Sequence, residues 1–527
     1  MEVLRSSLGF LPRTALVAGA RSYRYADVLS AAVTTCRQLE SRRATQPGSN
    51  AGGTAAQDAG PRVALMADPG AAYVAGAYGT WLHGGITVPL CLTHPDRELQ
   101  YVLEDAEVSS VLVSERHADR MAALAQPFGA EVLLVETQPQ QEAGQPVDKG
   151  QAEELQREVG HRLEGRGGGE GALIIYTSGT TGRPKGALHT HGSLAAQVDT
   201  LCEAWAWQQA DRILHCLPLH HVHGIVNALL CPLSTGACAE MLPKFSPREV
   251  WQHLQRKEDA VTVFMGVPTM YSHLLTWRDN HMDAKQQAAA AAAARRLRLT
   301  VSGSAACPGP IMQRWEELSG NKLLERYGMT ETGMILGNPY SGERRPETVG
   351  QPFEGVQVRL ANADGSDAGA GPGELRVKSP QLFKQYWRRP EATAEAFDEQ
   401  DFFLTGDTGI IEGGYYKLLG RTSVDIIKHG GYKISALHIE SALLEHPALA
   451  EVAVLGLPDE VYGERIAAVA ALKNGGSLTL QELRAFASAS LPAYQLPAEL
   501  KVVPAIPRNA MGKVNKKELR KQLFPSD

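Results

Sequence analysis

The chain has 527 residues, of which 43% are hydrophobic and 21% are charged, and its formal net charge is −6. This balance is typical of globular proteins and gives no reason to expect nucleic-acid binding, while the length indicates roughly two to four folding units. No apolar run reaches the roughly 20 uninterrupted residues that a membrane span needs. The seven cysteines lack CxxC spacing, which favours reduced thiols over a disulfide scaffold.

The N-terminal segment has several arginines and Glu2 as its only acid, a pattern shared by weak organelle-targeting sequences. However, ALVAGARSYRYADVL (15–29) predicts two short strands joined at Gly19–Ala20 and followed by a helix. That leaves only about a dozen residues for a presequence. We therefore expect a cytoplasmic protein, with a mitochondrial or plastid location as the alternative.

Short apolar runs alternate with helical patterns through most of the chain. Fully apolar strands separated by amphipathic helices predict α/β sheets that are covered on both faces. The predicted strands are RVALMA (62–67), GITVPLCL (85–92), SSVLVSE (109–115), EVLLVE (131–136), ALIIYTS (172–178) and AVTVFMGV (260–267). Two polar segments, 42–60 and 136–170, lack apolar periodicity and predict loops, whereas the alanine run 288–294 predicts a helix.

Near the C-terminus, EVAVLGLPD (451–459) and RIAAVAALK (465–473) predict two strands of a smaller α+β unit. The segment 419–433 replaces the apolar pattern with glycines and charges, which is typical of a domain boundary. We therefore predict a large N-terminal domain, residues 1–421, and a C-terminal domain, residues 422–527.

The most specific motif is YTSGTTGRPKG (176–186), which follows an apolar strand directly. Its three glycines let backbone N–H groups approach a phosphate, and its hydroxyls and Lys185 add further donors and a positive charge. It is not a Walker loop, because that loop needs GxxxxGK[ST] at the start of a helix, and here Pro184 precedes the lysine. The motif predicts a phosphate-binding loop at a strand end, where α/β proteins bind their ligands.

This motif resembles the phosphate-binding loop of the adenylate-forming superfamily, which includes acyl-CoA synthetases, firefly luciferases and peptide-synthetase adenylation domains. Further motifs similar to those of the family follow in order: VSGSAA (301–306), ERYGMTE (325–331), TGD (405–407), LGR (419–421) and PRNAMGKVNKKEL (507–519). The resemblance implies an α/β fold, with a large N-terminal domain of α/β subdomains and a β-barrel-like portion. A small, mobile α+β C-terminal domain would carry the catalytic lysine.

The resemblance also implies an activity and the residues that perform it. Such enzymes join a carboxylic acid to the α-phosphate of ATP and then transfer the acyl group to a thiol, so the expected cofactors are ATP, Mg²⁺ and CoA. Lys513 would bridge the acid and the α-phosphate, Thr330 would bind the α-phosphate, and Glu331 would hold Mg²⁺. The implied nucleotide- and CoA-binding residues are Thr177, Ser178, Gly179, Thr180, Thr181, Gly182, Arg183, Pro184, Lys185, Tyr327, Gly328, Asp407, Arg421, Gly430 and Gly431.

The stretch HCLPLHHVHG (215–224) holds four histidines and Cys216, which raises the question of a metal site. His221 and His223 have no third ligand nearby in sequence, and the segment lies between a strand-like and a helical run. We therefore interpret it as a strand–loop–helix turn at a ligand cleft, with His215 in the core. The resemblance implies that this turn is one wall of an acid pocket, with His221 and Val222 facing the substrate. The resemblance is greatest to the plant and animal malonyl-CoA synthetases, which implies malonate, or its homologue methylmalonate, as substrate.

A dicarboxylate needs a cation for its distal carboxylate. Malonate-activating relatives have Arg or Lys shortly after the VPT-x-Y segment, where this chain has His273, and a histidine is a weaker anchor because it is neutral for much of the time at pH 7. The other predicted pocket residues are Ser304, Met334 and Arg344.

Three alternatives remain open from the sequence alone. The chain could activate another short-chain or aromatic acid, or it could load a carrier protein instead of free CoA. It could also be a silent binding protein. No carrier-like domain with a DSL-type serine follows Asp527, so we expect free CoA as the acceptor. The intact Lys185, Glu331, Asp407 and Lys513 favour an active enzyme. The expected partners are thus small molecules, and the oligomeric state is not set.

Overall fold

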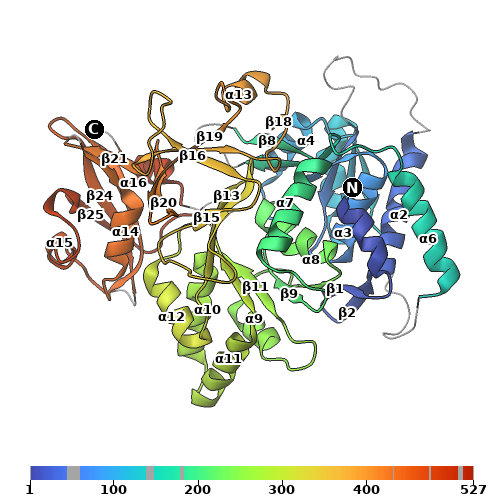
Figure 1. Ribbon diagram of the computed structural model, residues 1–527, viewed down its shortest axis with the longest axis horizontal. Coiled ribbons are helices and arrows are strands. Elements are labelled where there is room, and N and C mark those ends of the chain that lie inside the picture. The colour runs from blue at the N-terminus through green and yellow to red at the C-terminus, as the bar shows by residue number, and fades with distance from the viewer. Residues whose placement is uncertain are drawn as a thin grey trace.

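The structure is a computed structural model that describes residues 2–43, 60–137, 147–177, 183–430, 432–473, 476–508 and 514–525. Within these residues the chain forms four sheets with helices packed around them (Figure 1). The mixed α/β architecture, with a large N-terminal part and a smaller C-terminal part, agrees with the predicted fold class.

A seven-stranded sheet forms one half of the N-terminal part. Its order is β18 (Gln385–Tyr386), β8 (Lys185–Thr190), β7 (Gly171–Thr177), β4 (Ile86–Pro89), β3 (Arg62–Met66), β5 (Ser110–Val113) and β6 (Glu131–Leu134). The strands from β7 to β6 are parallel, and β8 and β18 are antiparallel additions at one edge. The helices that accompany this sheet are α3 (Ala71–Leu82), α4 (Asp96–Asp105), α5 (Ala118–Ala125) and α6 (Lys149–Leu163).

A nine-stranded sheet forms the other half. Its order is β15 (Gln351–Pro352), β14 (Gly333–Gly337), β13 (Leu324–Met329), β12 (Leu299–Ser302), β11 (Val263–Gly266), β9 (Arg212–His215), β10 (Cys238–Met241), β1 (Thr14–Ala18) and β2 (Arg21–Arg24). The helices of this half are α1 (Glu2–Ser7), α2 (Tyr25–Arg43), α7 (His191–Ala204), η4 (His223–Leu230), α8 (Cys231–Ser234), α9 (Pro247–Leu254), α10 (Pro268–His281), α11 (Ala284–Arg296) and α12 (Gly309–Ser319). Helices α9 to α12 form a group at the bottom of the view in Figure 1.

Two smaller sheets complete the fold. A four-stranded antiparallel sheet contains β16 (Gln357–Ala361), β17 (Gly373–Lys378), β19 (Phe403–Glu412) and β20 (Tyr415–Arg421), and the short helix α13 (Pro390–Ala394) lies between β18 and β19 in the chain. The C-terminal sheet contains β22 (Tyr432–Ser435), β21 (Ile426–His429), β24 (Gly463–Leu472), β23 (Leu449–Asp459) and β25 (Glu499–Val503), with helices α14 (Ala436–Leu444), α15 (Leu480–Ala487) and α16 (Lys516–Leu523). The predicted domain boundary after Arg421 falls between these two sheets and stays a prediction.

The predicted apolar strands are confirmed as β3, β4, β5, β6, β7, β11, β23 and β24, and most of their residues are buried. The two strands predicted near Gly19–Ala20 are also confirmed, as the antiparallel pair β1 and β2. The alanine run lies in α11, whose N-terminus is capped by Asp283 and Gln286 in a reciprocal capping box. Ala290, Ala293 and Ala294 are buried, so this helix packs into the core.

The loop predicted over 136–170 is wrong for residues 149–163, which form α6. Asp148 caps the helix by accepting a hydrogen bond from the backbone N–H of Gln151. Only Val159 and Leu163 of the helix are buried, so its apolar face is too narrow to give a clear periodic pattern. Residues 44–59 of the other predicted loop lie outside the described residues.

The N-terminal segment packs into the domain. Val3 and Leu4 of α1 are buried, and Leu4 is fully shielded from solvent. Among the described residues, no helix combines the length and the apolar character needed to cross a bilayer.

Candidate functional site

Four of the predicted site segments leave the same edge of the nine-stranded sheet. Strands β13, β12, β11 and β9 are neighbours and run parallel, so their carboxyl ends lie side by side. In sheets of this kind ligands bind beyond the carboxyl ends of the strands. The segments that follow these ends contain Thr330 and Glu331 after β13, Ser304 after β12, His273 after β11, and His221 and Val222 after β9. The sheet therefore brings together residues that are more than 100 positions apart in sequence.

The HCLPLHHVHG segment connects β9 to η4, a π-helix, a form that occurs frequently at functional sites. His215 is buried and donates a hydrogen bond from Nε2 to the carbonyl oxygen of Gly224 (2.9 Å), and burial lowers the pKa of His215 to about 4. Its predicted place in the core is confirmed. A Cβ atom on residue 224 would lie 2.1 Å from the carbonyl oxygen of Pro218, so this close turn requires glycine.

His221 and Val222 follow this turn. His221 is half-buried, and its ring centroid lies 4.0 Å from that of His220. Val222 is buried, with 4% of its surface exposed. Their predicted contact with the substrate stays a prediction.

The predicted phosphate loop joins β7 to β8. Thr177 ends β7 and Lys185 begins β8; the two residues are paired across the strands, and Oγ1 of Thr177 donates to the carbonyl oxygen of Lys185 (3.3 Å). Tyr101 holds the end of the loop, because its hydroxyl donates to the carbonyl oxygen of Pro184 (2.7 Å) and its ring lies 5.7 Å from the Arg183 guanidinium. The predicted phosphate ligands Ser178, Gly179, Thr180, Thr181 and Gly182 lie outside the described residues.

Glu331 and Lys185 meet at Tyr386, a residue that the sequence did not single out. The Tyr386 hydroxyl donates to Oε1 of Glu331 (2.8 Å), and the Lys185 ammonium lies 5.0 Å from the Tyr386 ring centroid. Tyr386 reaches this place because β18 pairs with β8. Burial and then the charge of Glu331 raise the pKa of Tyr386, so its hydroxyl remains a donor at neutral pH.

Asp407, Arg421 and Tyr327 form a second cluster. Asp407 and Arg421 are cross-strand partners on β19 and β20, and Nε of Arg421 lies 2.8 Å from Oδ1 of Asp407. The Tyr327 hydroxyl donates to Oδ2 of the same carboxylate. Two anchors on different elements thus fix the orientation of a carboxylate with 7% of its surface exposed. Gly328 follows Tyr327 on β13.

A buried histidine supports Thr330. His189 is fully buried and donates from Nε2 to the carbonyl oxygen of Thr330 (2.7 Å). Burial lowers the pKa of His189 to about 4, so the ring is neutral at physiological pH. Gln197 lies 3.2 Å from its other ring nitrogen. The sequence signal was a histidine four residues after Lys185, which cannot be told from a core histidine without the structure.

The structure also reveals a buried cation, Arg326 on β13, beside the predicted pocket residue Ser304. The side chain has 2% of its surface exposed, its Nη2 lies 3.5 Å from Oγ of Ser304, and its Nε makes no hydrogen bond. A Cβ atom on Gly303 would lie 2.6 Å from Cζ of Arg326, so glycine lets the guanidinium pack against the backbone. Ser304 has φ +68°, an uncommon conformation for serine that is often found at functional sites.

Arg326 and its neighbour Glu325 are both buried, and each stabilises the charged form of the other. Burial raises the pKa of Glu325 to about 8, so its carboxyl group is mostly protonated at neutral pH. Burial also lowers the pKa of Arg326, to about 9, which still leaves it a cation. A buried guanidinium in these surroundings is stabilised by an incoming anion.

The other predicted substrate residues lie in different surroundings. Met334 is buried on β14, with 3% of its surface exposed. His273 is exposed on α10, and its ring stacks on Phe245 at 6.3 Å between centroids. Arg344 donates to three backbone carbonyl oxygens, those of Lys322, Pro339 and Tyr340, at 2.6 to 3.0 Å. We therefore correct the prediction for Arg344: its guanidinium holds the loop after β14 and is not available as a substrate anchor.

The C-terminal residues are described only in part. Gly430 follows β21 with φ +57° and donates its N–H to the carbonyl oxygen of Tyr462 (2.9 Å), whereas Gly431 and Lys513 lie outside the described residues. Just after β20, the Asp425 carboxylate accepts from the backbone N–H of Arg421 (2.9 Å) and from the half-buried Lys516 ammonium (2.5 Å). Asp425 therefore connects the end of β20 to helix α16.

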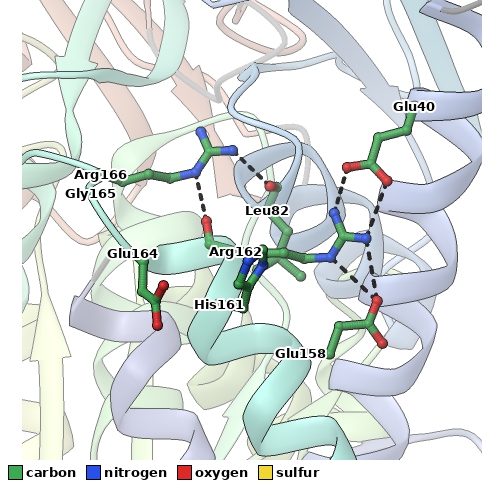
Figure 2. Close-up of a pocket in the computed structure, with 8 residues that line it drawn as sticks. All are labelled: Glu40, Leu82, Glu158, His161, Arg162, Glu164, Gly165 and Arg166. Carbon is green, nitrogen blue, oxygen red and sulfur yellow. Dashed lines mark hydrogen bonds and ion pairs between the residues drawn. The ribbon is translucent and has the colours of Figure 1, made fainter.

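A surface cavity of 620 Å³ lies apart from these residues, between α2, α6 and the end of α3 (Figure 2). Arg162, which lines this cavity, lies between Glu40 and Glu158 and donates hydrogen bonds to both carboxylates. Arg166 and its neighbours precede β7, whereas the predicted phosphate loop follows the opposite end of that strand. This cavity is therefore separate from the candidate active site.

Comparisons with known proteins agree with this arrangement. The family model for AMP-binding enzymes matches residues 13–387, and the model for the C-terminal domain of AMP-binding enzymes matches residues 438–513. A probable CoA ligase of Humulus lupulus is 47% identical over 88% of this chain and 80% of its own. The malonate–CoA ligase of Arabidopsis thaliana is 44% identical (97% and 86%), and the mitochondrial malonate–CoA ligase of Mus musculus is 45% identical (88% and 82%).

Solved structures are similar over nearly the whole chain. ATP-bound MatB from Rhodopseudomonas palustris is 31% identical, with a TM-score of 0.84 and 99% of both chains covered. A malonyl-CoA ligase in a ternary complex with methylmalonyl-CoA and AMP is 34% identical, with a TM-score of 0.63 and coverage of 94% of this chain and 97% of that one. The chain belongs to the AMP-binding enzyme family of acyl-CoA ligases.

Proposed function

We propose that this enzyme is a malonate–CoA ligase, with methylmalonate as the closest alternative acid. The proposal rests on sequence identities of 44% and 45% to two malonate–CoA ligases, over 97% and 88% of this chain. In the first step a malonate carboxylate oxygen attacks the α-phosphorus of ATP, and pyrophosphate leaves with the electrons of the broken P–O bond. In the second step the CoA thiolate attacks the acyl carbon, and AMP leaves. The thiol proton passes to solvent, and malonyl-CoA, AMP and pyrophosphate are the products.

The first step brings two anions together, so positive charge and hydrogen-bond donors must offset their repulsion. Lys185, at the start of β8 and paired with Thr177 at the carboxyl end of β7, would bind the phosphates together with the residues of the motif between them. Lys513 would bridge the malonate carboxylate and the α-phosphate. Thr330, held by His189, would bind the α-phosphate.

Asp407 would accept hydrogen bonds from the ribose hydroxyls. The contacts with Arg421 and Tyr327 would orient this carboxylate toward the sugar. Gly328, next to Tyr327, would contact the nucleotide through its backbone; its lack of a side chain is required by the close approach of Gly333, whose carbonyl oxygen would lie 2.0 Å from a Cβ atom. The positive charge of Arg421 would in addition attract the phosphates.

The residues present fit a magnesium ion at Glu331. Mg²⁺ prefers oxygen ligands and is usually bound by one or two carboxylates together with the phosphates of the substrate. Glu331 is a buried carboxylate with 6% of its surface exposed, and Tyr386 fixes one of its oxygens. When bound, the ion would neutralise phosphate charge. Glu331 would hold it, Tyr386 would orient the Glu331 carboxylate, and Lys185 would add a second positive charge beside them.

The distal carboxylate of malonate would bind Arg326 and Ser304. The unpaired Nε of Arg326 and the burial of its positive charge both favour an anion at this place. His221 and Val222 would form the neighbouring wall from the segment after β9. Met334 would add an apolar contact from β14, and His273, at the exposed surface of α10, would contribute at the entrance. A long-chain acid would place an apolar tail beside the Arg326 charge, which disfavours it.

In the second step, the C-terminal domain would turn about Ser423 to Asp425 and present Gly430 and Gly431 to the pantetheine arm of CoA. Two successive glycines allow a thin substrate to pass close to the backbone. The division into residues 1–421 and 422–527 is part of this proposal.

Pyrophosphate release in the absence of CoA tests the adenylation step. We expect malonate to give up to one pyrophosphate per active site, and addition of CoA to convert the bound acyl-adenylate to malonyl-CoA, identified by its mass. Release that does not depend on malonate, or a product other than malonyl-CoA, would contradict the proposed function.

For the location of the enzyme, we propose the cytoplasm, with the mitochondrion as the alternative that the name of the mouse relative supports. The burial of Val3 and Leu4 in the domain core favours a structural role for the N-terminal segment. A fluorescent protein fused after Asp527 distinguishes the two: diffuse signal supports the cytoplasm, and overlap with a mitochondrial dye refutes it.

A further inference from the structure

A cysteine and two histidines from different parts of the chain meet outside the proposed catalytic residues. Cys91 follows β4, His94 precedes α4, and His220 lies in the segment between β9 and η4. One potential ligand atom from each residue lies within 4.8 Å of the other two. The His94 and His220 ring centroids are 5.8 Å apart. These three residues are called the Cys91 cluster below.

The geometry of the Cys91 cluster is close to that of a zinc site. Zn²⁺ binds thiolate sulfur at about 2.3 Å and imidazole nitrogen at about 2.0–2.1 Å in a tetrahedron, which places ligand atoms roughly 3.3–3.6 Å apart. Separations of up to 4.8 Å close to these values by small side-chain rotations. One thiolate and two imidazoles are a ligand set that selects zinc over magnesium or calcium.

The surroundings of the cluster independently favour a metal. A carboxylate oxygen of Glu98 lies 3.3 Å from Nδ1 of His94, and such a contact orients the ring of a ligating histidine in many metal sites. Nε2 of His220 is buried without a hydrogen-bond partner. Cys91 has 4% of its surface exposed, and Thr93 lies 3.3 Å from its sulfur.

A second group of possible ligands, Cys36, Glu40 and His83, is a poorer site. Figure 2 shows that Glu40 is already bonded to the guanidinium of Arg162, at 2.5 and 3.2 Å. A metal would have to compete with this ion pair. Cys36 therefore serves as the matched control for Cys91, because both are buried cysteines with potential ligands beside them.

We propose that the Cys91 cluster binds one Zn²⁺ ion through Cys91, His94 and His220, with a solvent molecule as the fourth ligand. The ion would connect the segment after β4, in the seven-stranded sheet, to the segment after β9, in the nine-stranded sheet. His220 would be fixed by the metal, and His221, whose ring lies against it, would be positioned beside the acid pocket. This role is structural and separate from the proposed Mg²⁺ at Glu331.

Metal titration of the full chain tests the proposal. The protein is first treated with a chelator and dialysed, and Zn²⁺ is then added in competition with a chromophoric chelator. We expect one equivalent to bind tightly and to raise the thermal midpoint of unfolding. Co²⁺ in place of zinc should give a thiolate-to-cobalt charge-transfer band and the intense visible bands of a tetrahedral ion.

Variants identify the ligands. Cys91→Ser should abolish the charge-transfer band, His220→Ala and His94→Ala should each weaken zinc binding at least about 10-fold, and Cys36→Ser should bind as the parent does. If a variant fails to fold, the cobalt spectrum of the unmodified protein still shows whether a thiolate binds the metal in a tetrahedral site. Absence of stoichiometric zinc binding, an octahedral cobalt spectrum without a thiolate band, or loss of binding in Cys36→Ser but not in Cys91→Ser would each overturn the proposal.

Discussion

Replacing Arg326 with glutamine isolates the charge that we assign to the distal carboxylate of malonate. Glutamine keeps one amide donor and much of the length of the side chain, but it removes the positive charge. Because Glu325 is mostly protonated at neutral pH, its pKa being raised to about 8 by burial, the substitution leaves no unpaired carboxylate behind. The change therefore acts on the substrate more than on the fold.

The size of the effect follows from the burial of Arg326, which has 2% of its surface exposed. A hydrogen bond to a charged group contributes about 1.5–3 kcal/mol, and loss of one partner of a buried ion pair costs about 3–5 kcal/mol. Since the amide retains one donor, we expect a loss of about 2–4 kcal/mol. This corresponds to a kcat/KM for malonate that is about 30- to 1000-fold lower.

Steady-state pyrophosphate release with saturating CoA measures this effect. The KM for ATP should stay within about twofold of the parent value, because Arg326 acts on the acid alone. Arg344→Gln is the matched control: it removes the same charge from a side chain bonded to three carbonyl oxygens, and it should lower the thermal midpoint without a malonate-specific loss. The reasoning is refuted if Arg326→Gln keeps the parent kcat/KM for malonate while His273→Ala loses it.

Three further predictions concern the nucleotide side and stability. Asp407→Asn should raise the KM for ATP about 10- to 100-fold with little change in the KM for malonate, since it removes the charged acceptor held by Arg421; equal changes in both would contradict the ribose role. Tyr386→Phe should raise the Mg²⁺ concentration for half-maximal pyrophosphate release about fivefold, and an unchanged value would exclude Tyr386 from the site. Burial lowers the pKa of His189 and His215 to about 4. Between about pH 6.5 and pH 4 the unfolded chain therefore binds more protons than the folded chain. The free energy of unfolding should fall as the pH falls, by up to about 1.4 kcal/mol per pH unit for each ring. The thermal midpoint should thus drop from pH 7 to pH 5, less steeply in His215→Asn, and a flat midpoint would contradict this account.

Much of the fold could be predicted because buried parallel strands are continuous apolar runs. Strands such as β3 and β7 lie where the apolar residues are, because the central residues of both strands are buried on both faces. Helix α6 was missed because it buries only Val159 and Leu163, so its sequence lacks a clear apolar pattern. The capping aspartate, Asp148, was the one local signal of its start.

Candidate site residues could be named from the sequence where they lie in a short motif. Residues that join the site only through the pairing of strands could not. Asp407 and Arg421 lie in separate motifs that β19 and β20 bring together as cross-strand partners. Tyr386 has no motif of its own and reaches Glu331 only because β18 adds to the edge of another sheet. Arg326 lies within the ERYGMTE motif, but its burial beside Ser304 cannot be read from sequence.

The HCLPLHHVHG segment likewise has features that the sequence shows and contacts that only the fold shows. Its interpretation as a turn at a ligand cleft followed from the residues that flank it. A metal site was set aside because no third ligand was nearby in sequence. Cys91 and His94 supply those ligands from 126 or more positions away, through contact between loops of two different sheets.

The most direct test of the central claim is a comparison of acids by the purified enzyme with ATP, Mg²⁺ and CoA. Malonate, methylmalonate, succinate, acetate and 4-coumarate are each supplied, and kcat/KM for the acyl-CoA product is measured. We predict the highest value for malonate, with methylmalonate next, because only these place a second carboxylate at the short distance that Arg326 and Ser304 allow. Acyl-CoA formation from acetate or 4-coumarate with none from any dicarboxylate would contradict the account.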